Sequence, residues 1–315
     1  MSGVREHRLE GLEQDNLLAF LALLGLLRAL ETVGLQPRAH WAGLPLRPVL
    51  SLPEAMTQEE VAEAAAQGCL KLSDEHDFDG EKDLTFDAAR ARRLLEAALL
   101  PQAPGRAALY GALFCDGALK EDGRVDATPL CAMFGQGHQH FLARLADVPR
   151  GALPKALAKR RPPPDLNSRE KLMAALFAPW ERADETDGFR WDPVEDRRYA
   201  LRFKNPSSDV IRTEHGANRL ATVGLAAMPG AAVMRRRRIR FLTLGAEFAP
   251  DGSLEITWPI WDRPASLQGV QALLAHPALV GEAGEELQRF GVVDRRRARR
   301  IANGKFMNFS RAEAV

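Results

Sequence analysis

The fold is decided by residues 16–33, which read NLLAFLALLGLLRALETV. The apolar spacing predicts a helix whose first three turns are apolar on every side, and such a helix is normally buried all round. Asp15 or Asn16 is placed to cap its N-terminus, while Gly34 stops it with Pro37 just beyond. We therefore expect a central core helix around which the rest of the chain packs.

This run does not predict a membrane segment. Its most apolar part, residues 17–27, is shorter than the roughly 20 residues that cross a bilayer. Acidic residues precede it in place of a basic leader, and no small-residue cleavage site follows it. The three cysteines form no CxxC pair, so neither a disulfide framework nor a structural zinc site is supported. The sequence therefore predicts a cytoplasmic protein without a membrane partner.

Outward from the central helix, periodicity predicts an α+β fold. The N-terminal half is expected to be helix-rich, and the C-terminal half to hold an antiparallel sheet flanked by helices. The predicted helices cover residues 57–68, 86–100, 266–275 and 283–300, and the predicted strands cover 199–203, 237–244 and 254–261. We expect the last two strands to pair as an antiparallel hairpin.

A change in composition suggests where the chain divides. Basic residues meet Pro162, Pro163 and Pro164 in a row, and such a run fits neither a helix nor a central strand. The sequence therefore predicts a Pro-rich basic linker at 151–170. On this division, residues 1–150 form a helical half that packs against other subunits, and residues 171–315 form an α+β half with a basic sheet face.

The net charge of +1 hides a segregation of sign along the 315 residues. Residues 74–87 hold seven acidic side chains against one lysine, and residues 286–315 hold eight basic side chains against three acidic ones. Hydrophobic residues make up 46% and charged residues 27%, which is typical of a globular protein rather than a disordered one. The two charged regions could therefore face different partners.

No convincing catalytic motif is present, and we expect neither a cofactor nor a metal. The motifs GxSxG, Walker A and HExxH are absent. His138 and His140 form an HxH pair without further ligands at a suitable spacing. The acidic loop at 73–83 resembles part of a calcium-binding loop. Phe86, however, occupies the position at which such a loop needs a bidentate carboxylate. The sequence thus favours a non-catalytic protein.

Basic side chains at strand spacing form the first candidate binding surface. With Tyr199, Leu201 and Phe203 inward, alternation turns outward the residues Arg198, Arg202 and Lys204. With Ile239 and Phe241 inward, it likewise turns outward Arg236, Arg238 and Arg240, while Arg235 and Arg237 face the other way. Guanidinium groups in such a row suit a phosphate backbone, although arginines on an exposed strand also serve edge protection and solubility.

The C-terminal segment forms the second candidate surface. A helix capped by Asp294 would place one group of side chains on adjacent turns of one side, namely Arg295, Arg296, Arg299 and Arg300. Gly304 would end this helix, and Lys305 would lie in the loop beyond it. Such a basic helix suits nucleic acid, a solvated face or an acidic partner subunit.

Four stretches resemble a known family in their order and spacing. They are LEGLEQDNLLAFLALLGLLRAL at 9–30, FGQGHQHFLARL at 134–145, GANRLATVGLAAMP at 216–229 and WPIWDRPASLQGVQALLAHPAL at 258–279. The chain resembles subunits of type I-G (formerly I-U) CRISPR systems, both large-subunit-like proteins and helicase-nuclease extension proteins. The resemblance implies a non-catalytic subunit of an RNA-guided, DNA-targeting antiviral complex. Its implied partners are guide RNA or target DNA, other effector subunits and the helicase-nuclease.

The sequence is also compatible with two other functions. The first is a protein scaffold or nuclease recruiter whose basic surface meets an acidic protein and not nucleic acid. The second is a metal-dependent nuclease that uses His138, His140 and the acidic loop.

Overall fold

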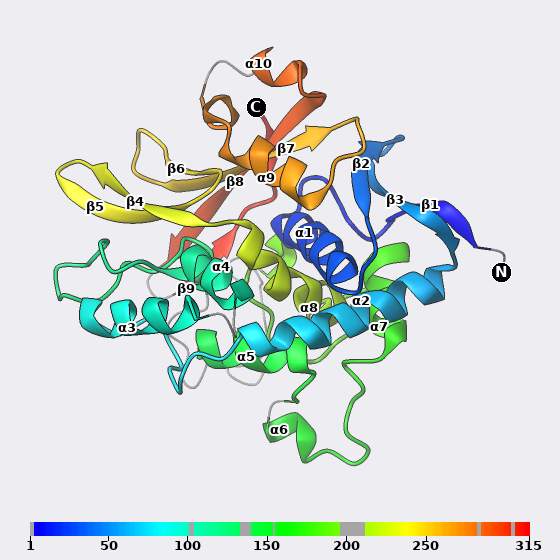
Figure 1. Cartoon of the computed structure of the whole chain (residues 1–315), viewed down its shortest axis with the longest axis horizontal. Coiled ribbons are helices and arrows are strands. Elements are labelled where there is room, and N and C mark those ends of the chain that lie inside the picture. Colours follow the sequence, from blue (N-terminus) through cyan, green and yellow to red (C-terminus); the bar gives the residue numbers. More distant parts are fainter. Residues whose placement is uncertain are drawn as a thin grey trace, which may run out of the picture.

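A computed structural model shows a mixed α+β protein with a helix-rich N-terminal half and a sheet-rich C-terminal half, as the sequence predicts (Figure 1). The structure describes residues 3–100, 104–132, 140–153, 155–195, 212–281, 285–303 and 306–315. Over these ranges, no helix has both the length and the apolar character needed to span a membrane.

Helix α1 (Leu17–Thr32) lies at the centre of the molecule, and the expectation of a buried core helix is confirmed (Figure 1). Every residue from Leu17 to Leu27 is buried. The Asn16 side chain caps the helix by accepting a hydrogen bond from the backbone N–H of Leu18 at 3.0 Å. A helix that is apolar on all sides thus has protein on all sides.

Two helices pack closely on α1 because glycines lie at the crossings. Helix α8 (His215–Gly224) meets α1 where Gly25 faces the backbone of Leu220, and a Cβ at Gly25 would overlap that carbonyl oxygen. Helix α2 (Gln58–Leu72) meets α1 where Gly68 faces the backbone of Ala29. Backbones can approach this closely only where a side chain is missing.

The remaining helices surround this centre. The helices predicted at 57–68 and 86–100 are confirmed, and Thr57 and Asp87 cap them through their side chains. The further helices are α3 (Ala88–Ala98), α4 (Pro104–Leu113), α5 (Phe141–Arg150), α6 (Lys155–Ala158), α7 (Arg169–Phe177), α9 (Leu267–Ala275) and α10 (Glu285–Gln288). Short 3-10 turns lie at Ser73–Glu75, Pro193–Glu195, Leu225–Ala227 and Pro277–Leu279.

The N-terminal half also contains a three-stranded antiparallel sheet that the sequence did not predict. Its order is β1 (Val4–Arg8), β3 (Arg47–Met56) and β2 (Arg38–Ala42). The outer strand β2 joins the C-terminal half through an antiparallel bridge between Ala39 and Ala265. Figure 1 shows this sheet on the right, beside α1.

The C-terminal sheet has the order β10-β8-β7-β6, and β9 also pairs with β8. Its strands are β6 (Ala246–Phe248), β7 (Leu254–Trp261), β8 (Val292–Asn303), β9 (Phe306–Phe309) and β10 (Glu313–Ala314). The expected pairing of 237–244 with 254–261 is wrong. Strand β5 (Arg238–Thr243) instead pairs with β4 (Gly230–Arg235), and β7 pairs with β6 and β8. The physical reason is the tight turn at Arg236 and Arg237, which joins β4 directly to β5.

The predicted helix at 283–300 is also wrong. Helix α10 covers only Glu285–Gln288, and the arginine-rich segment after it is the long strand β8. Val292 begins this strand, which pairs with β7 on one side and with β10 and β9 on the other. Strand propensity depends on the neighbours that a side chain finds across the sheet, and periodicity alone does not reveal those neighbours.

One hydrophobic core runs through both halves of the chain. The same buried cluster contains α1, residues of α2 and α5, and the inner residues of β7 and β8 such as Ile256, Trp258 and Ala298. The segment predicted as a linker, residues 151–170, contains α6, which is followed by exposed residues from Lys159 to Pro163. Its role as a linker stays a prediction.

Candidate nucleic-acid interface

Four of the predicted basic residues lie outside the residues that the structure describes. They are Arg198, Arg202, Lys204 and Lys305. The strand expected at 199–203 lies in the same range, so the first predicted row of basic side chains stays a prediction. The remaining candidates, on β5, on β8 and in the turn before β5, can be located.

Strand β8 carries the arginines that were expected on a helix, and two of them pair with acids near the same face. Arg299 binds Glu255 Oε1 through Nη2 at 2.9 Å and Asp251 Oδ2 through Nη1 at 3.1 Å. Arg297 Nη2 lies 3.0 Å from Glu247 Oε1. Because these acids balance the charge of the guanidinium groups, this face of β8 offers little free positive charge to a polyanion.

The other three predicted arginines of β8 are also engaged within the protein. Arg296 binds Asp294 at 2.6 Å, and Arg300 donates to the carbonyl oxygen of Pro129 at 3.4 Å. Burial lowers the pKa of Arg300. Arg295 donates to three carbonyl groups of the preceding segment, those of Ala278, Leu279 and Gly281. The predicted basic helix face is therefore replaced by a set of internal contacts.

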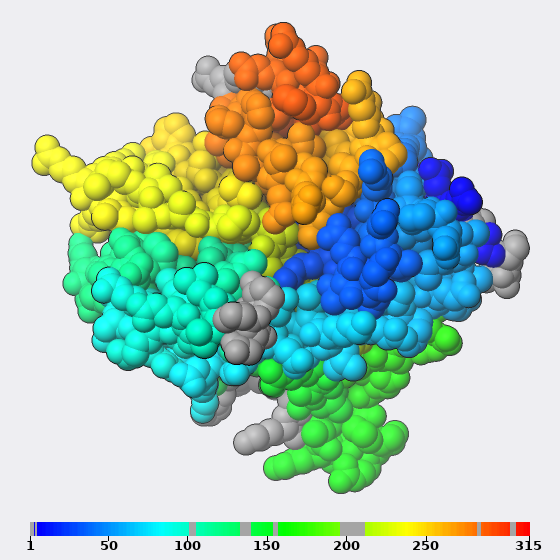
Figure 2. Space-filling model, viewed as in Figure 1, coloured from blue at the N-terminus to red at the C-terminus, as the bar shows by residue number. Residues whose placement is uncertain are grey.

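The hairpin of β4 and β5 forms a separate two-stranded arm at the edge of the molecule (Figures 1 and 2). Its turn consists of Arg236 and Arg237, whose φ angles of 43° and 67° are typical of a two-residue turn of the primed type. Arg235 pairs directly with Arg238 across the hairpin. The chain thus places four consecutive arginines at the tip.

This register corrects the predicted alternation. Arg238 and Arg240 share one face of β5, as expected, but Arg236 lies in the turn and not on that face. Arg235 was expected to point away, yet it lies on the same face as Arg238 because directly opposed residues share a face. The turn reverses the chain between them, and alternation counted along a single strand cannot include that reversal.

The hairpin is fixed by contacts with β6, with the residue after β6 and with the loop at 119–126. The guanidinium carbons of Arg235 and Arg240 lie 4.6 and 4.9 Å from the ring centre of Phe248. Arg235 also donates to the carbonyl oxygens of Phe248 and Ala249, at 2.8 and 3.0 Å. Asp126 accepts from Arg240 Nε at 2.7 Å and from the backbone N–H of Phe241 at 3.0 Å. These contacts hold the arm in one orientation.

The tip remains open to solvent. Arg236, Arg237 and Arg238 are all exposed. Arg236 donates to the carbonyl oxygen of Pro250 at 3.1 Å, and Arg238 pairs with Glu121 at 2.6 Å with both side chains more than two-thirds exposed. Arg237 has no hydrogen-bond or ion-pair partner among the residues that the structure describes. An exposed ion pair is weak, so Arg238 can exchange its partner.

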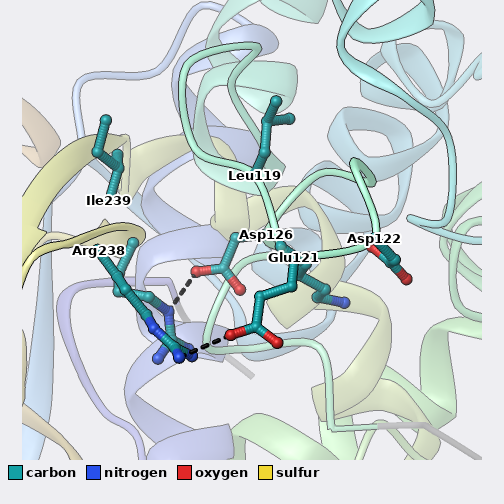
Figure 3. Close-up of a pocket in the computed structure, with 8 residues that line it drawn as sticks. Leu119, Glu121, Asp122, Asp126, Arg238 and Ile239 are labelled. Carbon is teal, nitrogen blue, oxygen red and sulfur yellow. Dashed lines mark hydrogen bonds and ion pairs between the residues drawn. The ribbon is translucent and has the colours of Figure 1, made fainter.

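An open pocket of about 560 Å³ lies between this hairpin and the loop at 119–126 (Figure 3). Arg238, Ile239 and Arg240 line it from β5, and Glu121 and Asp126 line it from the loop. The two ion pairs, Arg238 with Glu121 and Arg240 with Asp126, cross from one wall to the other.

No protein-family model matches the chain, and no curated protein is significantly similar to it. The resemblance to type I-G CRISPR subunits therefore stays a prediction.

The residues of the alternative metal site are only partly described. His138 lies outside the described residues, and His140 Nδ1 lies 2.6 Å from Asp83 Oδ2. Over the described ranges, no group of three or more His, Cys, Asp or Glu side chains is placed to hold a metal ion. A metal-dependent nuclease thus gains no support from the described residues, and the expectation that no metal binds stays a prediction.

A buried polar cluster near the start of α8 is a feature that the sequence did not predict. Asp184 accepts from the backbone N–H of His215 at 3.0 Å and forms an ion pair with Lys171. Burial raises the pKa of Glu195 and of Glu214 to about 7, and it lowers the pKa of His215 to about 3. These residues lie between positions 171 and 215 without a regular spacing, so the sequence pattern did not reveal the cluster.

Proposed function

We propose that this chain is a non-catalytic nucleic-acid-binding subunit whose β4–β5 hairpin contacts the phosphate backbone. The observation that carries this proposal is the run from Arg236 to Arg238 at the exposed tip of the arm, where Arg237 has no partner among the described residues. Guanidinium groups bind phosphate oxygens with paired hydrogen bonds, and such contacts give affinity without sequence preference. The tip therefore suits the backbone of either DNA or RNA.

The anchoring of the arm supports this role. Arg235 and Arg240 pack on Phe248, and Arg235 also donates to its carbonyl oxygen, so the hairpin is held in place close to its tip. A preorganised group loses less conformational entropy on binding than a mobile loop does. The arginines of the hairpin thus divide into two that fix the arm, Arg235 and Arg240, and three that are exposed at its tip.

The sequence resemblance supports an RNA-guided, DNA-targeting complex of the type I-G CRISPR class as the setting. Guide RNA and target DNA both present the phosphates that the tip would bind. The arginines of β8 are not part of the proposed surface because acids and carbonyl groups of the same chain already engage them.

The test replaces Arg236, Arg237 and Arg238 together by Gln and measures binding to a labelled single strand and a labelled duplex by fluorescence anisotropy. Affinity should fall for both ligands and for all sequences alike. For each phosphate that the variant no longer binds, the slope of log K against log salt should shrink by about 0.7 on a single strand and by about 0.9 on a duplex. The melting temperature should stay unchanged because the three side chains are exposed.

A matched control removes the same three charges elsewhere. Arg5, Arg38 and Arg289 are exposed and lie on β1, on β2 and just after α10. Their joint replacement by Gln should change affinity much less. Equal losses of affinity in the two triple variants would show that binding depends on the overall positive charge of the protein. That result would overturn the proposal that the hairpin tip is the contact surface. Binding by the wild type that does not respond to salt would favour the scaffold function.

A further inference from the structure

The pocket between the hairpin and the 119–126 loop combines apolar sides with a charged interior. Leu119 stands on the loop and Ile239 on β5, on opposite sides of the pocket, and their side chains are 38% and 41% exposed (Figure 3). The ion pairs of Arg238 with Glu121 and of Arg240 with Asp126 lie between the two walls. A ligand here would meet aliphatic surface on its faces and hydrogen-bonding groups at its edge.

The two ion pairs differ in how firmly they are held. Asp126 is nearly buried, with its side chain 9% exposed, and it also accepts from the backbone N–H of Phe241. Glu121 is 79% exposed, and Arg238, its only partner among the described residues, is exposed as well. The inner pair is therefore a fixed part of the pocket. The outer pair keeps acceptor and donor groups free for a ligand because an exposed ion pair is weak.

The pocket itself does not suit a phosphate group. The charges that line it balance, because three carboxylates, those of Glu121, Asp122 and Asp126, are matched by three cations, those of Lys120, Arg238 and Arg240. A neutral, flat ligand with polar edges fits better, since it can contact Leu119 and Ile239 while its edge meets the outer ion pair. An unpaired nucleobase has this chemistry, and the arginine tip beside the pocket would hold the strand that carries it.

We propose that this pocket receives an unpaired nucleobase that bears an exocyclic amino group, as cytosine and adenine do. Glu121 accepts a hydrogen bond from the amino group, and Arg238 donates to the ring nitrogen beside it. Thymine and uracil have a carbonyl oxygen in place of the amino group and an N–H in place of the ring nitrogen, so in the same placement an acceptor would face Glu121 and a donor would face Arg238. The inference rests on the proposed function, because the hairpin tip must first bind the strand. It adds a preference for single strands and for one class of base.

The test compares labelled oligo(dC) and oligo(dT) single strands at slightly alkaline pH, where cytosine strands stay unpaired. Wild-type protein should bind oligo(dC) about five- to tenfold more tightly, because a hydrogen bond to a charged group contributes roughly that ratio when it is partly exposed. Glu121→Gln should weaken the preference, because a neutral amide oxygen is a poorer acceptor than a carboxylate, and should leave the affinity for oligo(dT) within about twofold. Its melting temperature should equal that of the wild type.

Asp122→Asn is the matched control. It removes the same charge from the next position of the loop, where the carboxylate accepts from the backbone N–H of Arg124 and points away from Arg238 (Figure 3). This variant should keep the preference for oligo(dC). Tight but equal binding of both strands by the wild type would overturn the base pocket and leave the phosphate-binding tip intact. Equal strengthening of both strands by Glu121→Gln would also overturn it, because Glu121 would then only mask Arg238. Failure of the wild type to bind either strand would overturn the proposed function itself.

Discussion

At the scale of single residues, stability depends on places where a backbone has no room for a side chain. Gly25 on α1 is such a place, because a Cβ there would overlap the carbonyl oxygen of Leu220 on α8. Gly224 makes the reciprocal contact with the backbone of Leu21. The crossing of the two central helices therefore depends on these two glycines.

Replacing Gly25 by Ala should lower the free energy of unfolding by about 3 kcal/mol or more, because the helices must separate to admit the methyl group. Gly111→Ala is the control, since a Cβ at that position of α4 meets nothing within 4 Å. Gly111→Ala should raise the free energy of unfolding by up to about 1 kcal/mol, because alanine has a higher helix propensity than glycine. Urea unfolding of both variants checks the pair. Equal stability of Gly25→Ala and the wild type would show that α1 and α8 do not approach this closely at Gly25.

Glu195 gives a residue-level prediction about pH. Burial raises its pKa from 4.5 to about 7, while hydrogen bonds from Thr213 and the backbone of Arg190 act in the opposite direction. Below the unfolded pKa both states hold the proton, so there is no penalty. Between the unfolded pKa of 4.5 and the folded pKa of about 7, Glu195 ionises in the unfolded chain but stays protonated in the folded one. The free energy of unfolding therefore falls as pH rises, and the total loss above the folded pKa is at most roughly 3 kcal/mol.

Glu195→Gln stays neutral at every pH, so this loss should disappear in the variant. Urea unfolding between about pH 5 and about pH 8 should show the difference in stability moving in favour of Gln as pH rises. The buried His76, whose pKa is lowered to about 4, titrates in both proteins and cancels in the comparison. A constant difference across the range would mean that Glu195 is ionised and solvated when folded.

At the scale of elements, the hairpin shows how burial decides which of two similar ion pairs matters. Asp126→Ala should lower the free energy of unfolding by about 2 to 3 kcal/mol, because Arg240 and the N–H of Phe241 lose a nearly buried acceptor. Glu121→Ala removes an exposed pair with Arg238 and should change it by less than about 1 kcal/mol. Thermal unfolding of the two variants tests this ranking. Similar losses in both would show that the hairpin is not anchored at Asp126.

The elements also show how far the sequence predicts this structure. Helix α1 could be predicted because its apolar residues leave no solvent-facing side, and α2 and α3 because Thr57 and Asp87 mark their starts. The arginine-rich strand β8 could not, because the acids that pair with Arg297 and Arg299 come from β6, β7 and the turn between them. Periodicity records which side chains share a face, but it does not record what lies across the sheet.

The candidate site was predictable to a similar degree. The excess of arginines at 235–240 points correctly to an exposed basic segment, and the shared face of Arg238 and Arg240 follows from alternation. The turn at Arg236 and Arg237 did not follow, because positive φ angles are uncommon for arginine and no Gly or Asn marks the position. The pocket with Glu121 joins segments more than a hundred residues apart, and only the fold brings them together.

At the scale of the whole molecule, the charge distribution along the sequence separates two halves, whereas the packing joins them. The sequence separates acidic from basic regions, yet many charges pair within the fold, as Arg28 does with Glu75. Across the halves, Asn16 donates to Asp192 at 3.2 Å and Arg28 to the carbonyl oxygen of Val223 at 3.0 Å. The central helix α1 thus belongs to the N-terminal half in sequence and to both halves in packing.

This arrangement predicts that neither half folds alone. In a fragment of residues 1–150, α1 would no longer pack on α8 and would expose an apolar face, which favours aggregation over folding. The fragment should show no cooperative thermal transition by circular dichroism, whereas the full chain should unfold in a single one. Co-expression with residues 151–315 should restore a soluble complex, because the core of both pieces then closes around α1. A fragment of residues 1–150 that unfolds sharply by itself would show that the halves are independent domains and that the α1–α8 contact is a dispensable interface.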